Sequence, residues 1–150
     1  MERPTKNKTF MEMAEITALR SHDAETKVGS VLVSNKTQDI LGMGYNGFVR
    51  GAKDEQLPNT RPEKYKYIVH SEQNLICNLV RRGVSTDDST LYCTMSPCVI
   101  CMRMLYQAGV TKIICKEKYR DFDSLKEMGD LDIKETITTE GYFVFDYEVK

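Results

Sequence analysis

The chain has 150 residues, of which 41% are hydrophobic and 29% charged, and it contains no Trp. This composition excludes a disordered chain, a collagen-like repeat and a multi-domain machine, so we expect residues 1–150 to form a single domain. Lys and Arg total 21 and Asp and Glu total 22, for a formal net charge of -1. A nucleic-acid partner is not expected, because a general nucleic-acid coat needs a basic surface.

The first half of the chain predicts one helix and a β-hairpin. Residues 9–20 carry apolar side chains at helical spacing, and residues 28–33 form a short, β-branched strand. A turn over 35–39 connects it to a second strand over 40–45, so these strands should pair antiparallel. Residues 46–66 show no sustained periodicity, and a loop this long in a compact domain is usually functional or mobile.

The second half alternates helices and strands. The pattern predicts a helix over 70–82 ending at Gly83, a strand over 90–94, a helix with Pro97 in its first turn extending to about 107, a strand over 112–115, a short helix over 123–128 and a final strand over 141–149. This alternation favours an α/β domain with helices on both faces. The sheet should be mixed, because its first strands form a hairpin and its later strands are joined by helices.

No apolar run approaches the roughly 20 residues of a membrane helix, and the first residues do not resemble a secretory signal. The five cysteines are an odd number. In a reducing compartment cysteines bind metal or are buried more often than they form disulfides. We therefore expect a cytoplasmic protein with no membrane partner.

Two short strings carry chemistry: His70-Ser71-Glu72 and Pro97-Cys98-Val99-Ile100-Cys101. An imidazole nitrogen and two thiolates are preferred zinc ligands, and three protein ligands leave a fourth position for water. A zinc-bound water ionises near neutral pH, and a carboxylate that is not a ligand can carry its proton. The joint pattern H-x-E and P-C-x-x-C is the signature of zinc deaminases. We predict one zinc ion bound by His70, Cys98 and Cys101, with Glu72 as the catalytic residue.

The spacing restricts how these residues can meet. Positions two apart on a helix lie about 200° apart around its axis, so His70 and Glu72 share a site only if their helix presents its first turn end-on. Cys98 and Cys101 lie three apart, on one face of the first turn of their own helix. We expect both helix starts to face one metal ion, where the helix dipoles favour thiolates.

The other cysteines and the second histidine have simpler interpretations. Cys77 lies seven residues after His70, a rise of roughly 10 Å along a helix, which is too far to share its metal. Cys93 and Cys115 are interpreted as small buried hydrophobic side chains. His22 is interpreted as a histidine at a helix end or on the surface, with a second metal site or a substrate contact as the alternative.

From about residue 18 to 121 the chain resembles the deoxycytidylate (dCMP) deaminases, within the cytidine-deaminase-like zinc enzymes. Besides the zinc motif, the likeness rests on Arg20-Ser21-His22-Asp23 with Lys27-Val28-Gly29, on Gly44-Tyr45-Asn46-Gly47, and on Glu117-Lys118-Tyr119-Arg120-Asp121. The resemblance implies a three-layer α/β/α fold with a mixed central sheet. It also implies conversion of dCMP to dUMP and ammonia, which supplies dUMP for thymidylate synthesis, by a homo-oligomer that is hexameric in the family.

The resemblance further implies regulation. In many members dCTP activates and dTTP inhibits at a subunit interface, here near Gly44, Tyr45 and Gly47, with Mg²⁺ accompanying the nucleotide effector. Ser71 stands where the family usually has Ala. Its backbone N–H is expected to face the reacting base, and its hydroxyl should change the rate more than the mechanism.

The remaining substrate contacts are predicted one by one. Asn46 can donate and accept, which suits a ribose hydroxyl, and the Ser96 carbonyl can accept from the amino group of the base. Val28 is either a wall for the pyrimidine or ordinary core. The phosphate needs cations or N–H donors; the candidates are Lys27, Lys118, Arg20 and, favoured by the resemblance, Arg120, with Tyr119 over the base.

Three alternatives stay open. The zinc chemistry also suits cytidine, dCTP or single-stranded nucleic acid as the substrate. A non-catalytic zinc-stabilised module would bind zinc without turnover, although such a site does not need Glu72. A Cys-x-x-Cys redox protein would bind no metal and would show a reactive thiol pair.

Overall fold

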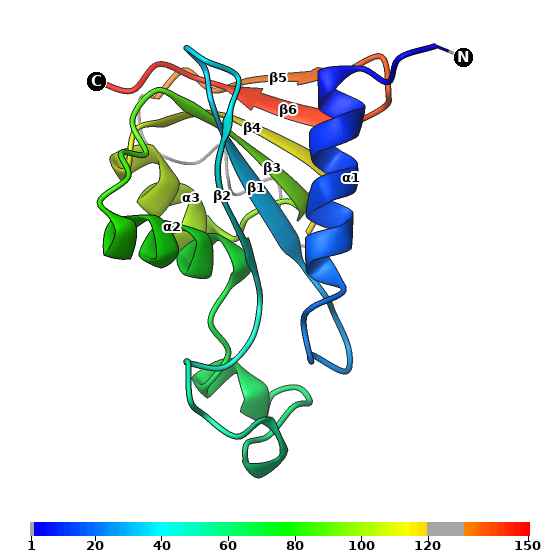
Figure 1. Ribbon diagram of the computed structural model, residues 1–150, viewed down its shortest axis with the longest axis vertical. Coiled ribbons are helices and arrows are strands. Elements are labelled where there is room, and N and C mark those ends of the chain that lie inside the picture. Colours follow the sequence, from blue (N-terminus) through cyan, green and yellow to red (C-terminus); the bar gives the residue numbers. More distant parts are fainter. Residues whose placement is uncertain (1, 120–130) are drawn as a thin grey trace.

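The computed structural model describes residues 2–119 and 131–150. In this part of the chain a six-stranded sheet has the strand order β2-β1-β3-β4-β6-β5 (Figure 1). Its strands are β1 (Gly29–Ser34), β2 (Ile40–Tyr45), β3 (Ser89–Met95), β4 (Val110–Glu117), β5 (Lys134–Ile137) and β6 (Phe143–Asp146). β3 and β4 run parallel and the other neighbours antiparallel, which confirms the mixed sheet.

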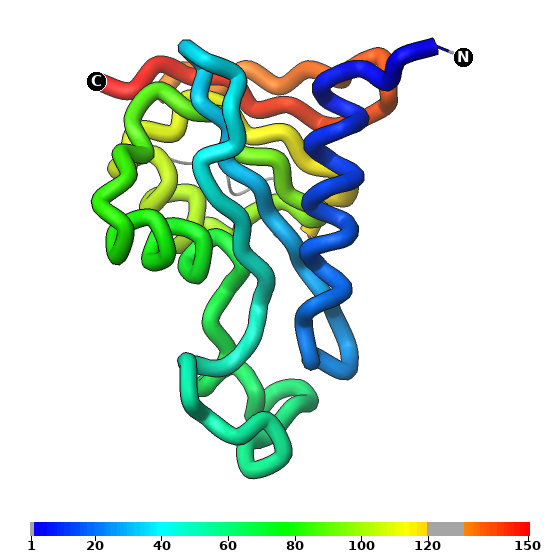
Figure 2. Tube along the Cα trace, in the orientation of Figure 1, coloured from blue at the N-terminus to red at the C-terminus, as the bar shows by residue number. Residues whose placement is uncertain are grey.

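The helices cover both faces of this sheet. α1 (Lys6–Ala18) packs on one face of β1 and β3, whereas α2 (Ser71–Arg82) and α3 (Val99–Gln107) lie on the other face (Figure 1). The predicted three-layer α/β/α fold is therefore confirmed. The connection from β2 to α2 holds two 3-10 turns, η1 (Asp54–Gln56) and η2 (Glu63–Lys66), and extends away from the sheet (Figure 2).

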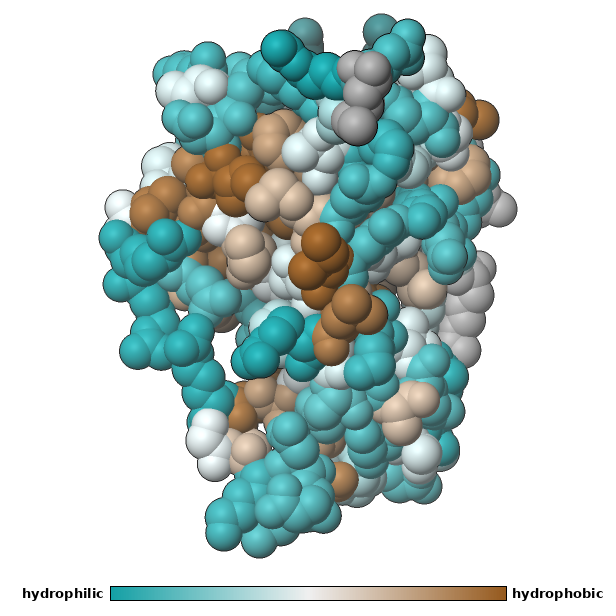
Figure 3. Space-filling model, turned by 45° about the vertical axis from the view of Figure 1, so that its right-hand side comes forward, coloured by the Kyte–Doolittle hydropathy of each residue, from teal (hydrophilic) through white to brown (hydrophobic). Residues whose placement is uncertain are grey.

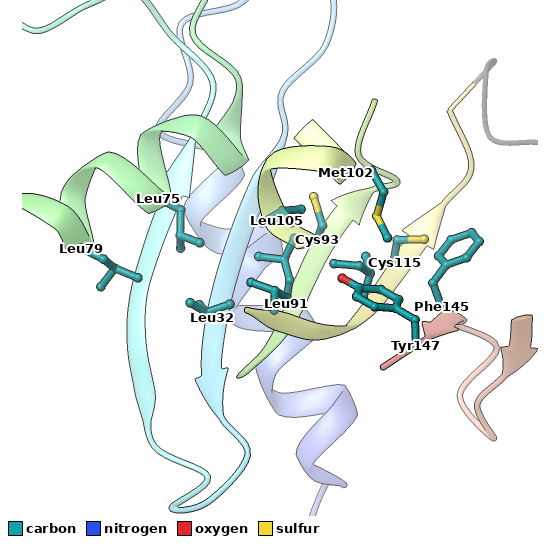
Figure 4. Packing of buried hydrophobic residues seen from close by; sticks show 12 residues of the cluster. Leu32, Leu75, Leu79, Leu91, Cys93, Met102, Leu105, Cys115, Phe145 and Tyr147 are labelled. Atoms are coloured by element: carbon teal, nitrogen blue, oxygen red, sulfur yellow. The ribbon is translucent and has the colours of Figure 1, made fainter. Parts of the chain in front are cut away.

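Two apolar clusters hold the layers together, because side chains alternate between the faces of a strand. Leu75 and Leu79 of α2 and Leu105 of α3 pack on the face that carries Leu32 and Leu91 (Figure 4). On the opposite face, the second cluster joins α1 to the strands through Met11, Ala14, Val31, Tyr92 and Ile114. Figure 3 shows a largely polar surface with apolar residues gathered at the upper left and in smaller patches elsewhere. Of the helices described, none is both long and apolar enough to span a bilayer.

Several predicted boundaries shift for local reasons. α1 begins at Lys6 rather than 9, because the Thr5 hydroxyl accepts from the Lys8 N–H and caps the helix. α1 ends at Ala18, and the following Leu19 is exposed. Pro97 precedes α3 rather than lying in its first turn, because the extended Cys98 is the N-cap residue.

The end of the chain departs further from the prediction. β5 was not predicted, since its largely exposed residues show no apolar alternation and it pairs only with β6. The final strand is shorter than expected, covering Phe143–Asp146. The short helix expected over 123–128 lies outside the described residues.

Two glycines bring helices into backbone contact with the β1–β2 hairpin. A Cβ on Gly44 would lie 2.5 Å from the Ser71 carbonyl oxygen of α2, and one on Gly29 would lie 2.6 Å from the Ala18 nitrogen of α1. Gly29 pairs with Tyr45 and Ser30 with Gly44, so the two glycines occupy neighbouring positions of the ladder. The two helices therefore touch the hairpin from opposite faces at nearly the same point.

Candidate active site

The starts of two helices build the centre of the site. His70 is the N-cap residue of α2 and Cys98 that of α3, and both have extended backbone angles. The His70 N–H donates to Gln73 Oε1 over 2.9 Å, and the Cys101 N–H donates to Cys98 Sγ over 3.4 Å. Both helices thus direct their first turns at one place, end-on, as the spacing of the motif requires.

His70, Cys98 and Cys101 come together there. His70 Nδ1 lies 3.5 Å from Cys98 Sγ and 3.4 Å from Cys101 Sγ. The three ligand atoms lie within 4.8 Å of one another, and in the described residues this is the one such group. One imidazole nitrogen and two sulfurs fit zinc and leave a fourth position free. Their role as ligands stays a prediction that this geometry supports.

The ionisation of these three groups is coupled through their contacts. The Cys101 thiol donates to Cys98 and, with the His70 ring, lowers the pKa of Cys98 to about 4. The same contact raises the pKa of Cys101, and the Cys98 sulfur raises the pKa of His70. A thiolate is thus already favoured at Cys98, and the thiolate is the form that binds metals.

Glu72 lies beside this group, at the second position of α2, and is only 3% exposed. Burial raises the pKa of its carboxyl group. The Cys93 thiol of β3 donates to Glu72 Oε1 over 2.9 Å, and burial keeps the pKa of that thiol well above its usual value. Cys93 is therefore buried as predicted, but it also holds one oxygen of the candidate proton carrier. The prediction that Cys93 is buried does not indicate this hydrogen bond to Glu72.

The other cysteines and His22 do not join the metal group. Cys77 is exposed and Cys115 is buried next to Cys93 in the neighbouring strand. The His22 ring packs 4.4 Å from the Phe48 ring, and its Nδ1 lies 3.8 Å from an Asp54 carboxylate oxygen. Among the residues that the structure describes, His22 therefore does not belong to a second metal-ligating cluster.

A pocket opens next to the metal group. His70, Glu72 and Cys98 lie in its lining, together with five residues predicted to bind substrate: Val28, Asn46, Ser71, Ser96 and Tyr119. The Tyr119 N–H donates to Ser96 Oγ over 2.7 Å, which fixes Tyr119 beside the start of α3. Arg120 lies outside the described residues.

Lys27 and the predicted effector residues lie elsewhere. Lys27 is exposed, donates to the Ser21 carbonyl and lines a different hollow. Gly44 packs under α2, Tyr45 accepts a hydrogen bond from Asn74 Nδ2 over 2.8 Å, and Gly47 pairs with Val69. Their predicted role in effector binding is not tested by these contacts.

The side chains of Asn46 and Ser71 are occupied by the protein itself. Asn46 Nδ2 donates to Asp23 Oδ2 over 3.3 Å and to the Thr26 carbonyl over 2.9 Å, while its Oδ1 accepts from the Val28 N–H over 2.8 Å. Only the second lone pair of Oδ1 is left for a substrate hydroxyl. The Ser71 hydroxyl bonds Ser30 Oγ at 2.6 Å and the Gly44 carbonyl at 3.0 Å, so it faces the hairpin.

Sequence reasoning missed the outer end of the pocket, which is lined by Asp23, Thr26, Arg61, Lys64 and Tyr65. Lys64 is 3% exposed, and its ammonium contacts both Asp23 oxygens at 2.9 and 3.0 Å and Glu25 Oε1 at 3.3 Å. Burial alone would raise the pKa of Asp23, but N–H donors from Thr26 and Glu25 and the Lys64 ammonium lower it. No periodicity over 46–66 marks Arg61 or Lys64, because their partners Asp23, Glu25 and Thr26 lie far away in the sequence.

The three layers and the end-on helix starts with a buried carboxylate define the class of cytidine-deaminase-like zinc proteins. A model of the cytidine and deoxycytidylate deaminase zinc-binding region matches residues 4–117, and the chain belongs to this family. It is 35% identical over 121 residues to the deoxycytidylate deaminase of Pongo abelii, covering 76% of this chain and 66% of that protein.

Two further comparisons agree. The chain is 38% identical to a probable deoxycytidylate deaminase of Caenorhabditis elegans, covering 83% of this chain and 65% of that protein. It therefore spans about two thirds of the length of these curated relatives. The crystal structure of dCMP deaminase from cyanophage S-TIM5 in complex with dCMP and dUMP is similar with a TM-score of 0.70 and 32% identity, covering 86% of this chain and 96% of that chain.

Proposed function

We propose that the protein is a zinc-dependent hydrolase that converts dCMP to dUMP and ammonia, as a single domain over residues 1–150. The observation that carries this proposal is the buried Glu72 carboxyl in one pocket with His70 and Cys98. The relatives named deoxycytidylate deaminase and the phage enzyme with dCMP and dUMP support the choice of substrate.

His70, Cys98 and Cys101 would hold the zinc ion. When bound, zinc lowers the pKa of a coordinated water to near neutrality and so supplies the nucleophile for C4 of the cytosine. A purely structural site would be closed by a fourth side chain, and within the described residues the cluster has three members. This supports a catalytic rather than a purely structural zinc.

Glu72 would carry the protons. Burial raises the pKa of this carboxyl group, which makes it a better proton acceptor than an exposed carboxylate. The carboxylate would take a proton from the attacking water and pass it to N3 of the ring. It would then take the second proton from the new hydroxyl group on C4 and pass it to the amino group, which leaves as ammonia while C4 becomes a carbonyl. The Cys93 thiol would hold Oε1 in place during these transfers.

The remaining contacts place the nucleotide. The Ser71 N–H and the Ser96 carbonyl would hold the base, Val28 would form a wall and Tyr119 a cover, and Asn46 Oδ1 would accept from a sugar hydroxyl. All five line the pocket, which supports these roles. Arg120 remains a predicted phosphate ligand.

We also propose a homo-oligomer, hexameric by family resemblance, with dCTP and dTTP as effectors that bind with Mg²⁺ near Gly44, Tyr45 and Gly47. Support for the oligomer comes from strand β2, which lies at the sheet edge and carries the exposed Met43. A second copy could cover this edge. A cytoplasmic location is supported by the cluster of free thiols, which a reducing compartment preserves.

A substrate panel tests the proposed activity. Ammonia release from the zinc-loaded chain is measured with dCMP, dCTP, cytidine and a short cytosine-containing DNA strand, with and without added dCTP and dTTP. We expect turnover of dCMP above all others. Preferred turnover of another cytosine compound would replace the substrate, and bound zinc without any turnover would indicate a non-catalytic module.

A further inference from the structure

The pocket has two ends of different chemistry. Its inner end holds the metal group and Glu72, whereas its outer end brings together two cations, Arg61 and Lys64. Both come from the connection between β2 and α2. A cytosine ring that reacts at the inner end leaves the rest of its nucleotide to extend towards the outer end.

Lys64 has little charge to offer a substrate. Its ammonium is nearly fully buried and lies within 3.3 Å of two carboxylates, those of Asp23 and Glu25. An ion pair of this kind is satisfied within the protein, and it fixes the η2 turn against the segment that follows α1.

Arg61 differs from Lys64 in exposure and in partners. Its side chain is 42% exposed, and its contact with Glu25 Oε2 is long, at 3.4 Å. Its Nε donates to the Tyr65 hydroxyl over 2.8 Å and its Nη2 donates to Thr26 Oγ1 over 2.8 Å. Five N–H groups are available on a guanidinium, and three have partners here, so the fork is held in place with donors to spare.

The cations predicted for the phosphate face other partners. Lys118 pairs with Glu135 at 3.3 Å, Arg20 lies 5.8 Å from the centre of the Tyr45 ring, and Lys27 donates to Ser21. In the described part of the chain these three do not line the pocket.

We infer that Arg61 binds the 5′-phosphate and makes the site selective for a cytosine nucleoside monophosphate over the free nucleoside. A planar guanidinium can donate hydrogen bonds to two phosphate oxygens at once. Because the Arg61 side chain is partly exposed, the phosphate dianion can bind there without leaving a buried charge unpaired. This inference deepens the proposed function and rests on it.

The test compares Arg61→Gln with the wild-type chain, both zinc-loaded, on dCMP and on deoxycytidine. We expect kcat/KM for dCMP to fall about 10- to 100-fold, mainly through KM, while the value for deoxycytidine stays within about twofold. Arg61→Lys should recover part of the loss, because it restores the charge without the fork. Lys53→Gln is the matched control, since Lys53 is exposed in the same connection and does not line the pocket.

An equal loss on both substrates, or no loss on dCMP, would overturn the inference. Binding of dUMP and deoxyuridine, measured by calorimetry, gives a second readout that needs no turnover. Arg61→Gln should weaken dUMP binding by a similar factor and leave deoxyuridine binding unchanged. If the wild-type chain releases no ammonia from any cytosine compound, the proposed function fails, and the dUMP comparison still decides the role of Arg61.

Discussion

The inner and outer ends of the pocket are built in opposite ways. At the inner end, two helix starts carry the reactive groups, and the four key residues lie pairwise in two motifs of short spacing, His-x-Glu and Pro-Cys-x-x-Cys. At the outer end, an ion pair joins Lys64 to Asp23 across 41 positions of sequence. Chemistry is therefore encoded locally, whereas the shape that selects the substrate depends on long-range contacts.

Glu72→Gln should separate activity from structure at the inner end. An amide of the same size cannot carry the protons, so we expect kcat to fall about 100- to 10,000-fold. Zinc content by atomic emission and the melting temperature should stay near wild type. His70→Ala should instead lose zinc together with turnover. Undiminished turnover in Glu72→Gln would remove the proposed proton carrier.

Lys64→Met, at the outer end, should mainly reduce the stability of the fold. It leaves the Asp23 carboxylate buried without its cation, which costs about 3–5 kcal/mol of unfolding free energy. Denaturant melts measure this cost, and zinc content should be retained. Adding Asp23→Asn should recover part of the loss, because the two residues are coupled. A strictly additive double variant would contradict the pairing.

The same pair predicts a pH dependence. The pKa of Asp23 is lowered in the folded state, so its contribution is complete above the unfolded value of about 3.9 and is lost as the pH falls from there through the folded pKa. Wild-type stability should decline more steeply in this acid range than that of Asp23→Asn. Parallel stability curves for the two proteins would argue against the assignment.

Gly44→Ala should disturb the packing of α2 on β2, next to the inner end. Its Cβ would meet backbone atoms of α2, which cannot move aside, so we expect a loss of about 1–3 kcal/mol in thermal or denaturant melts. Gly42→Ala is the matched control on the same strand. Its Cβ would meet the ends of the Leu79 and Arg82 side chains, which can shift, and its cost should be smaller.

Ser71→Ala should have the smallest effect. It removes the hydroxyl that bonds Ser30 and the Gly44 carbonyl, at a cost of about 1 kcal/mol. Because that hydroxyl faces the hairpin, KM for dCMP should not change. A large change in KM would mean that the hydroxyl reaches the substrate.

The sequence predicts the order of helices and strands and the residues around the metal, because apolar spacing and the His-x-Glu and Pro-Cys-x-x-Cys strings are local signals. It does not reveal that Cys93 bonds Glu72, since strand pairing and helix placement create that contact. It also misses Arg61 and Lys64, which lie in a segment without periodicity. Strand β5 is not predicted for a related reason, because an exposed edge strand carries no apolar pattern.

Gly29 and Gly44, at neighbouring positions of the β1–β2 hairpin, connect the two sides of the pocket. α1 leads into the segment that carries Asp23 and Thr26, and α2 begins with His70 and Glu72. Both helices rest on bare backbone at neighbouring rungs of one ladder. A shift of these two strands would therefore move both the segment with Asp23 and Thr26 and the Glu72 carboxyl group. A bulky substitution at either glycine would be expected to impair substrate binding and turnover together.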